Sequence, residues 1–392
     1  MSRLTDLRRR RGFGAARPRE RGFSLVELMI ASTIGLLILT AMISVFVSSS
    51  QSRDEVDKSS RQIENGRFAV EMLKEDIQLA AFYGDYSPSS ITWTTPDPCS
   101  LILNNMGFGA ANVPVGIYGY PDTVVAGATA ETPPDGVHEP SCLTNRKAAT
   151  DVLVVYRAST TQLKIDANED GTADANVTKE DGSTGATVAS LGAGYYLQVS
   201  NCSDTPTEAA YVMAKNPAAF TLHSVKPAGT PPNCMNGGLA PVRQYFVRIF
   251  YIATCNDCSG AGDGIPTLKM VELSPGASVC ATDPAASCGS ITTRSVAEGI
   301  ENMQFEYGVD TNLDGVPDSY SAAPAAADWQ NVTAVKIFLL ARNTEKSVGY
   351  TDAKTYSLAA DGSALTGTPF NDSYKRHVYV ATARASNIAN RR

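Results

Sequence analysis

Hydrophobic residues are concentrated in one uninterrupted run near the start of the chain. Between Leu28 and Val47 there is no charged residue and no proline. Because an α-helix rises about 1.5 Å per residue, about 20 such residues cross the roughly 30 Å hydrocarbon core of a bilayer. The run therefore predicts a helix that is long enough to span a membrane.

A helical period continues beyond this run. From Val56 onward, one helix face repeats in a heptad rhythm while charged residues fill the other faces; its positions are Val56, Ser59, Ile63, Gly66, Val70, Leu73, Ile77 and Ala80. A second apolar stripe indicates packing against a sheet; it contains Phe68, Met72 and Leu79. Gly84 is a candidate C-cap. We expect one helix from Phe23 to about Phe82, roughly 90 Å long.

The rest of the chain has the pattern of β-strands separated by long loops. Strands are predicted at 151–157, 195–200, 219–225, 243–254, 266–273, 302–309, 334–343 and 377–384. The expected fold class is α+β, with a long N-terminal transmembrane-plus-amphipathic helix packed on a large antiparallel β-rich head. The expected domains are a leader at 1–22, a membrane-spanning helix at 23–47, its amphipathic continuation at 48–83 and the head at 84–392.

The charge distribution predicts the orientation of the helix. The leader carries eight Arg against Asp6 and Glu20, a net charge of +6. Since the positive side of a membrane segment stays cytoplasmic, the chain after about Ser48 is expected to be exported. Subtracting this +6 from the whole-chain charge of −7 leaves −13 for the rest of the chain. An acidic exported domain argues against nucleic acid as the main partner.

The leader is too polar for an ordinary signal peptide, and the apolar run lacks a small-residue cleavage site at its far end, so cleavage is expected before the run. The residues Arg21, Gly22, Phe23 and Glu27 resemble the start of type IV prepilins. The resemblance implies cleavage by prepilin peptidase between Gly22 and Phe23, N-methylation of Phe23 and an acid at the fifth mature position. A similar Gly12–Phe13 pair is rejected because no apolar run follows it.

Glu27 needs a physical explanation. A carboxylate toward the bilayer centre costs about 2.5–3.5 kcal/mol even on lenient insertion scales. One interpretation is that Glu27 extends to the cytoplasmic interface, as long polar side chains near helix ends do. The resemblance to prepilins implies instead that Glu27 pairs with the free amine of Phe23 in a neighbouring subunit during assembly.

A narrower resemblance covers both ends of the mature chain. Four segments look like the PilW-type minor pilins of type IV pili: QIENGRFAVEMLKEDIQLAAFYG, DVLVVYR, EGIENMQFEYGVDTNLDGVPD and YKRHVYVATARASN. The resemblance implies that the protein joins other minor pilins and the major pilin in a complex that primes assembly and sits at the pilus tip, with roles in adhesion and twitching motility. A large PilY-type tip adhesin is a further expected partner. Before assembly, the chain is expected in the inner membrane with its head in the periplasm.

Two alternatives remain at this stage. A type II secretion pseudopilin of the J kind shares the helix and the β-rich head but is usually shorter. A membrane-tethered, calcium-dependent adhesin would use its head to contact a surface directly.

All eight cysteines lie in the exported part, where an even count indicates disulfides. Loop closure favours Cys99 with Cys142 and Cys202 with Cys234. Cys255, Cys258, Cys280 and Cys288 would then pair locally, either in chain order or crosswise. The CNDC segment at 255–258 could instead be a redox dithiol or half a zinc site. A disulfide is favoured because no second CxxC follows at zinc-ligand spacing and no βαβ pattern surrounds it.

Two segments match D-x-N-x-D-G-x-x-D. Acidic or amide oxygens at positions one, three, five and nine, with a carbonyl at seven and a glycine at six, can wrap around Ca²⁺. The candidate ligands are Asp166, Asn168, Asp170, Thr172 and Asp174 in one loop and Asp310, Asn312, Asp314, Val316 and Asp318 in the other. The alternative is that both are ordinary turns.

The sequence gives little support for catalysis. Its three histidines, His138, His223 and His377, belong to no recognised motif, and G-x-S-x-G, HExxH and P-loop motifs are absent. A structural protein rather than an enzyme is expected.

Overall fold

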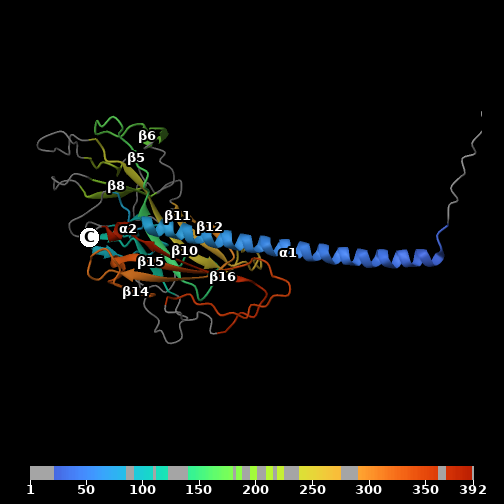
Figure 1. Cartoon of the computed structure of the whole chain (residues 1–392). Helices are drawn as coiled ribbons and strands as arrows, with labels where there is room; N and C mark the ends of the chain where they lie inside the picture. Colours follow the sequence, from blue (N-terminus) through green and yellow to red (C-terminus); the bar gives the residue numbers. More distant parts are fainter. Residues whose placement is uncertain are drawn as a thin grey trace, which may run out of the picture. The chain divides into compact units, whose positions relative to one another are not determined.

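The structure is a computed structural model that describes residues 22–84, 92–108, 112–121, 140–179, 182–187, 195–200, 209–214, 219–224, 238–274, 290–360 and 368–390 (Figure 1). It divides into two compact units, Met1–Asp57 and Lys58–Arg392. Predictions for the leader up to residue 21 and for Cys202, Cys234, Cys280, Cys288 and His138 fall outside the described residues.

The chain begins with one continuous helix, α1, which runs from Leu25 to Leu79. Its bounds lie within three residues of the expected ones. The predicted C-cap was wrong, because the left-handed residue after the last turn is Ala81, with φ of 58°, and Gly84 lies farther along the chain. Ala81 is fully buried and donates its backbone N–H to the carbonyl of Tyr156 at 2.9 Å. Tertiary packing therefore determines where the helix ends.

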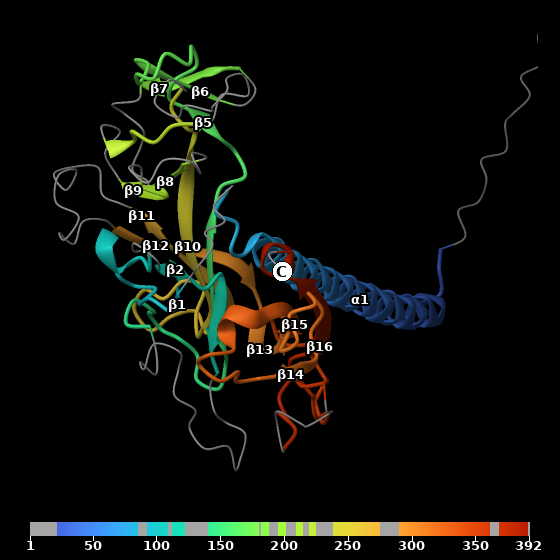
Figure 2. The same ribbon diagram turned by 90° about the vertical axis from the view of Figure 1, so that its left-hand side faces the viewer.

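In the described residues, three sheets follow the helix, and two of them are antiparallel (Figure 2). The ten-stranded sheet contains β3 (Ile117–Tyr120), β4 (Val152–Ala158), β5 (Leu163–Lys164), β6 (Asn176–Lys179), β7 (Thr184–Thr187), β8 (Tyr195–Val199), β9 (Tyr211–Ala214), β10 (Val242–Ala253), β11 (Thr267–Ser274) and β12 (Ser290–Glu298). The four-stranded sheet has the order β14 (Ser319–Ser321), β13 (Ile300–Val309), β15 (Val332–Arg342), β16 (Arg376–Arg384). A short parallel pair joins β1 (Thr92–Thr94) to β2 (Asn112–Pro114).

Strand β10 is the central element of the larger sheet. It pairs antiparallel with β11, β4, β8 and β5. The chain passes to the smaller sheet at Gly299, which joins the end of β12 to the start of β13. Gly299 has φ of 75°, and a Cβ there would lie 2.5 Å from the carbonyl oxygen of Arg342. Only glycine fits this corner without strain.

Seven of the eight predicted strands are present, but the segment 219–225 is not a strand in its described residues 219–224, apart from a single bridge at His223. The buried side chain of Gln198 accepts a hydrogen bond from Leu222 N–H at 3.0 Å and donates one to its carbonyl at 3.1 Å. The Gln198 side-chain amide therefore makes the backbone hydrogen bonds to Leu222 that a neighbouring strand would otherwise make. Sequence patterning also missed the exposed edge strand β12, because its residues are mostly polar.

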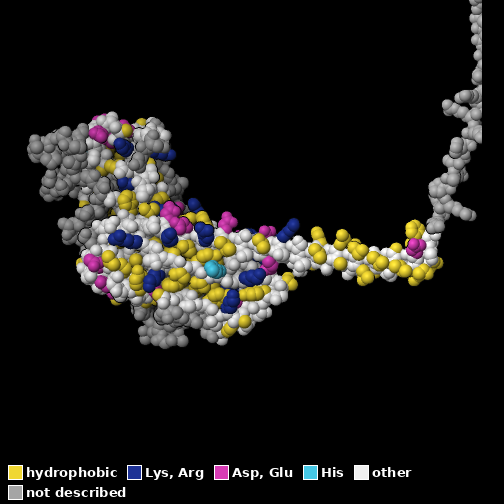
Figure 3. All heavy atoms as spheres, viewed as in Figure 1, with side chains coloured by type: hydrophobic (Ala, Val, Ile, Leu, Met, Phe, Trp, Pro, Cys, Tyr) yellow, Lys and Arg dark blue, Asp and Glu magenta, His cyan; other side chains and the backbone are white. Residues whose placement is uncertain are grey.

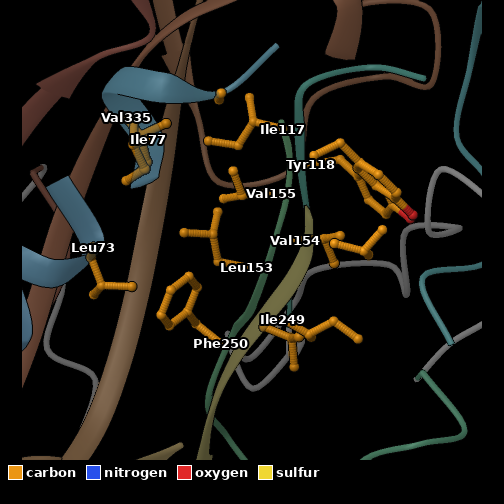
Figure 4. Close-up of a cluster of buried hydrophobic side chains, with 14 of the residues drawn as sticks. Leu73, Ile77, Ile117, Tyr118, Leu153, Val154, Val155, Ile249, Phe250 and Val335 are labelled. Atoms are coloured by element: carbon orange, nitrogen blue, oxygen red, sulfur yellow. The ribbon is translucent and has the colours of Figure 1, made fainter. Parts of the chain in front are cut away.

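The main hydrophobic core lies where the C-terminal part of α1 packs on the larger sheet (Figure 4). Leu73 and Ile77 of the helix point toward Leu153, Val155 and Phe250, which are all fully buried. The alternate residues of the same strands point to the opposite face of the sheet, where Tyr118, Val154 and Ile249 lie. Both faces of this part of the sheet are therefore covered, which explains its nearly continuous hydrophobic strands.

The helix face that meets the head differs in part from the predicted stripe. Leu73 and Ile77 are buried as expected, whereas Ile63 and Phe68 are exposed. Gly66 is buried against β16, where a Cβ would overlap the ring of Tyr379, 2.5 Å from Cζ. The helix therefore needs a glycine here to approach the sheet closely.

Gly66→Ala tests this close approach. At an exposed helix site, the change would stabilise the protein by up to about 1 kcal/mol. Here we expect the free energy of unfolding to fall by about 1–3 kcal/mol, because the added methyl group forces Tyr379 to move. The measurement is denaturant unfolding of the full chain in detergent. In a Tyr379→Ala background the same change should stabilise the protein, and a stabilising effect in the wild-type background would contradict this packing.

Candidate functional site

The N-terminal segment contains the residues expected to act in processing and assembly. Gly22 and Phe23 precede α1, and Glu27 lies in its first turn. A negative charge at this end of a helix interacts favourably with the helix dipole. The three residues therefore lie within one short segment at the start of the helix.

The hydrophobic residues that follow Glu27 are exposed. Large apolar side chains from Leu28 to Val47 have exposed fractions of 46–74%, and Figure 3 shows them covering this part of α1. Within the described residues, α1 is the one helix that is long and apolar enough to cross a membrane, with a mean hydropathy of 2.4 in its most apolar window. This surface requires lipid or other helices around it.

The C-terminal part of α1 is joined to the head by a buried ion cluster. The side chain of Asp76 is 1% exposed. Its carboxylate accepts a hydrogen bond from Arg157 Nε of β4 at 2.8 Å and two from an Arg248 nitrogen of β10, at 2.9 and 3.0 Å. Arg248 also donates to Glu272 of β11 at 2.9 Å. One helical carboxylate is therefore bound by two neighbouring strands.

Aromatic packing and charge reinforce this cluster. The guanidinium carbons of Arg157 and Arg248 each lie 5.0 Å from the centre of the Phe246 ring. Burial acts to lower the pKa of Arg248, but the charges and hydrogen bonds of Asp76 and Glu272 outweigh it and leave that pKa raised. Each charged side chain in the cluster therefore has a partner of opposite charge at hydrogen-bond distance, as a buried charge requires.

Polar contacts continue along the same helix. Gln62 donates to the carbonyls of Ala341 at 2.8 Å and Lys375 at 3.0 Å, at the ends of β15 and β16. Near the helix end, Asn387 donates to the carbonyls of Gln78 and Ala80. The segment Lys58–Leu79 is therefore held by both antiparallel sheets.

A second buried ion cluster fixes Asp352 and Asp372, which lie in the segment between β15 and β16. The side chain of Arg376 is fully buried and binds Glu301 at 2.5 Å, Asp352 at 2.9 Å and Asp372 at 2.6 Å. Its hydrogen bond is the main cause of the lowered pKa of Asp372. Through Arg376, Asp352 and Asp372 are therefore held near Glu301 of β13.

The first candidate calcium loop, 310–318, connects β13 to β14. Asp310 is fully buried, and its carboxylate accepts hydrogen bonds from the backbone N–H groups of Leu313, Asp314 and Gly315. Asp318 accepts hydrogen bonds from the Thr311 side chain and backbone, which lower its pKa. Asn312 donates to Asp314 at 3.3 Å and to Asp318 at 3.2 Å. The loop brings its candidate side chains together.

The second loop, 166–174, has the same local conformation. Asp166 is buried and accepts from the N–H groups of Asp170 and Gly171, as Asp310 does from the equivalent residues. Asp174 accepts from Ala167 N–H, as Asp318 does from Thr311. Both loops have positive φ at their fourth and sixth positions, which are Glu169 and Gly171 here and Leu313 and Gly315 in the first loop. The repeated signature therefore encodes one loop structure used twice.

A metal site is not evident from the side-chain positions. In the part of the chain that the structure describes, no three His, Cys, Asp or Glu side chains form a group that could hold a metal ion. The two loops hold their carboxylates mainly by their own backbone N–H groups.

Two disulfides are present in the described residues. Cys99 bonds to Cys142, the pair that loop closure favours, with 5.6 Å between their Cα atoms. Cys255 bonds to Cys258, so these two cysteines pair with each other rather than crosswise.

Comparison with protein families adds an independent observation. A family described as type IV pilus-assembly protein W matches residues 249–387, and the prokaryotic N-terminal methylation motif matches residues 17–43. Together the two matches support a type IV pilus minor pilin of the PilW type. Neither the curated proteins nor the solved structures contain a significant match.

The two matches correspond to distinct parts of the PilW-type pilin. The methylation motif contains Gly22, Phe23 and Glu27. The PilW match extends from within β10 to the last short helix, α2 (Ser386–Ala389), and includes Arg376 and the 310–318 loop. Domains of this family are structural. The N-terminal motif and apolar helix fit a membrane-anchored pilin that is later incorporated into a pilus.

Sequence patterning missed the Asp76 cluster, although a signal was present. Asp76 interrupts the apolar face between Leu73 and Ile77. Arg157 and Arg248 likewise stand at positions where their hydrophobic strands face the helix. A charge at a core-facing position requires a partner of opposite sign. The helix pattern contains the negative charge, Asp76, and the strand patterns contain the positive charges, Arg157 and Arg248.

Asp76→Asn tests the cluster in this PilW-type pilin. Removing the charge leaves Arg157 without its carboxylate, so we expect the free energy of unfolding to fall by about 3–5 kcal/mol. The measurement is denaturant unfolding of the full chain in detergent. Glu71→Gln is the control because it breaks the exposed Glu71–Lys74 pair, and it should change stability by less than about 1 kcal/mol. Equal effects of the two variants would show that the cluster does not hold the helix.

Proposed function

We propose that this minor pilin helps to prime and cap type IV pilus assembly by packing its N-terminal helix against those of other pilins. The proposal rests on the difference in burial between the N-terminal and C-terminal parts of α1. Its N-terminal part exposes large apolar side chains from Leu28 to Val47, whereas Lys58–Leu79 is held by the head. The apolar part is therefore the portion that can pass from lipid into a bundle of helices.

The partners follow from this surface. In the inner membrane, lipid covers the apolar residues; in a pilus, the helices of other minor pilins and the major pilin would cover them, because exposing this much apolar surface to water is unfavourable. Prepilin peptidase would act before assembly, at the bond between Gly22 and Phe23. The match of residues 249–387 to the PilW family favours a pilus over a type II secretion pseudopilin of the J kind.

Glu27 has a specific role in this proposal. Cleavage before Phe23 creates a positive amine four residues from the Glu27 carboxylate. Pairing Glu27 with the Phe23 amine of a neighbouring subunit would neutralise both charges, whereas an unpaired carboxylate toward the bilayer centre costs about 2.5–3.5 kcal/mol. The first subunits of a pilus end at its tip, so we place this pilin there, with a PilY-type adhesin as a partner of the head.

Glu27→Ala tests the assembly role. We expect the variant to be cleaved normally, so that mass spectrometry finds Phe23 as the N-terminus, but to co-purify with other pilins at a small fraction of the wild-type level. Pili should be correspondingly fewer. Glu64→Ala, which removes an exposed acid from the head-bound part of α1, should leave both unchanged. Normal pili that contain the Glu27→Ala subunit at wild-type level would show that Glu27 only extends to the interface.

We also propose that the two D-x-N-x-D-G-x-x-D loops bind Ca²⁺. Their shared conformation supports this, because an anchored first carboxylate and a glycine with positive φ at position six allow a loop to wrap around a cation. Asp310 accepts three hydrogen bonds and retains lone-pair capacity, since a carboxylate offers about four acceptor positions. Asp314 and Asp318 already lie at hydrogen-bond distance from the Asn312 side chain. The affinity should be weak, with Kd of roughly 10⁻⁴–10⁻³ M.

Calcium in the millimolar range should raise the Tm of the full chain in detergent. A ligand that binds only the folded state stabilises it by about 1.4 kcal/mol at ten times Kd. Asp314→Asn combined with Asp170→Asn should remove most of the shift, while the anchoring carboxylates Asp310 and Asp166 remain in place. Asp328→Asn serves as a control for lost negative charge. Identical melting curves in calcium and in chelator would make both segments ordinary turns.

A further inference from the structure

The Cys255–Cys258 disulfide occupies the connection between β10 and β11. Cys255 is buried: it is 6% exposed, and the turn at Gly262 comes so close that a Cβ there would lie 3.3 Å from Cys255 Cβ. Cys258 is partly exposed. Cys258 is therefore the more accessible of the two residues.

A buried lysine contacts this outer sulfur. Lys269, on β11, is 9% exposed, and its Nζ lies 3.3 Å from Cys258 Sγ and 3.0 Å from the carbonyl oxygen of Asn256. Within the described residues, no carboxylate lies at salt-bridge distance from this ammonium. A buried cation normally has an anionic partner, and here the group in that position is a sulfur that becomes anionic on reduction.

The acids around the disulfide make their hydrogen bonds within the loop and to β12, and the charge of Lys269 contributes to the lowered pKa of Asp257 after the hydrogen bonds from Ser259. Asp263 accepts backbone hydrogen bonds from Asn256, Asp257 and Ile265, and Asp257 accepts one from Ser259. On the adjoining strands, Glu298 of β12 accepts from the Asn256 amide, and Arg342 of β15 donates to the Gly264 carbonyl. These contacts keep the loop in one conformation and leave the Lys269 ammonium directed at Cys258.

We propose that Cys255–Cys258 is a thiol-exchange site, reduced by an exported protein dithiol, in which Lys269 stabilises negative charge on Cys258. A thiolate of the dithiol attacks Cys258 Sγ, the Cys255–Cys258 bond breaks, and its electron pair remains on Cys255, which takes a proton from water. The second thiolate of the dithiol then attacks its own partner sulfur in the mixed disulfide. Cys258 leaves as a thiolate beside Lys269, and the dithiol departs as a disulfide.

This chemistry separates the two described disulfides. The sulfur of Cys99 accepts a backbone hydrogen bond from Cys142 N–H at 3.1 Å, whereas the sulfur of Cys258 faces a full positive charge. A stabilised thiolate makes a disulfide easier to reduce. Cys255–Cys258 is therefore the more reducible of the two, and the mixed disulfide would give the head a reversible covalent link to a thiol-bearing protein.

The test uses the full chain in detergent and follows each disulfide by differential alkylation and peptide mass spectrometry. In a series of glutathione redox buffers, Cys255–Cys258 should open at a less reducing poise than Cys99–Cys142. Thioredoxin that lacks its resolving cysteine, used as the dithiol probe, should be trapped on Cys258. Lys269→Gln should lower the equilibrium constant for reduction of Cys255–Cys258 in these buffers about tenfold or more, because the charge that stabilises the Cys258 thiolate is lost. Lys269→Arg should restore most of that constant, and Lys336→Gln should have no effect.

Two outcomes would overturn the proposal. One is a Cys255–Cys258 disulfide that opens only together with, or after, Cys99–Cys142 in the wild-type chain. The other is an equal equilibrium constant for reduction of Cys255–Cys258 in Lys269→Gln and Lys336→Gln. If Lys269→Gln fails to fold, the pH dependence of Cys258 alkylation in the reduced wild-type chain decides the matter. Its midpoint should lie below the ordinary thiol pKa of about 8.5, and a midpoint at or above that value would exclude a thiolate stabilised by Lys269.

Discussion

The pairing of Asp76 with Arg157 and Arg248 is the constraint on which the rest of the head depends. A carboxylate can be buried under a hydrophobic sheet only when it is fully paired, so the helix has one position that satisfies Asp76 and its two arginines together. That position brings Leu73 and Ile77 onto β4 and β10 and places Gly66 against Tyr379 of the smaller sheet. The hydrophobic contacts supply most of the favourable free energy, and the ion cluster selects the register in which they form.

Local patterns predicted the helix and most of the long strands because each has a strong periodic signal over many residues. The contacts that failed to be predicted are those made between distant segments. Asp76 lies 81 residues from Arg157 and 172 from Arg248, and the segment around Leu222 has the composition of a strand but forms hydrogen bonds with the side chain of Gln198. Ala81 ends the helix in a conformation that glycine would adopt more easily, because its backbone bonds to Tyr156. No local signal identifies these partners.

The same distinction applies to the candidate functional residues. The sequence shows Gly22, Phe23 and Glu27 because they lie close together and are followed by an apolar run. The two loop signatures can also be recognised, because the residues of each are contiguous. The disulfide at 255–258 is one of the two local pairings that the spacing left open. Lys269 could not be foreseen, since only the antiparallel pairing of β10 with β11 brings it to the sulfur of Cys258. Chemistry within one segment is therefore visible in the sequence, and chemistry that depends on strand pairing is not.

The attachment of Lys58–Leu79 to both antiparallel sheets has a mechanical consequence. Gln62 bonds to the ends of β15 and β16, whereas Asp76 bonds to β4 and β10, and these two groups of contacts lie fourteen residues, or about 21 Å, apart along the helix. A force along the helix axis would act on both groups at once, in shear. Bonds loaded in parallel share the tension, whereas bonds that peel open one after another each bear it alone. The segment Lys58–Leu79 and the head should therefore withstand pulling as one body.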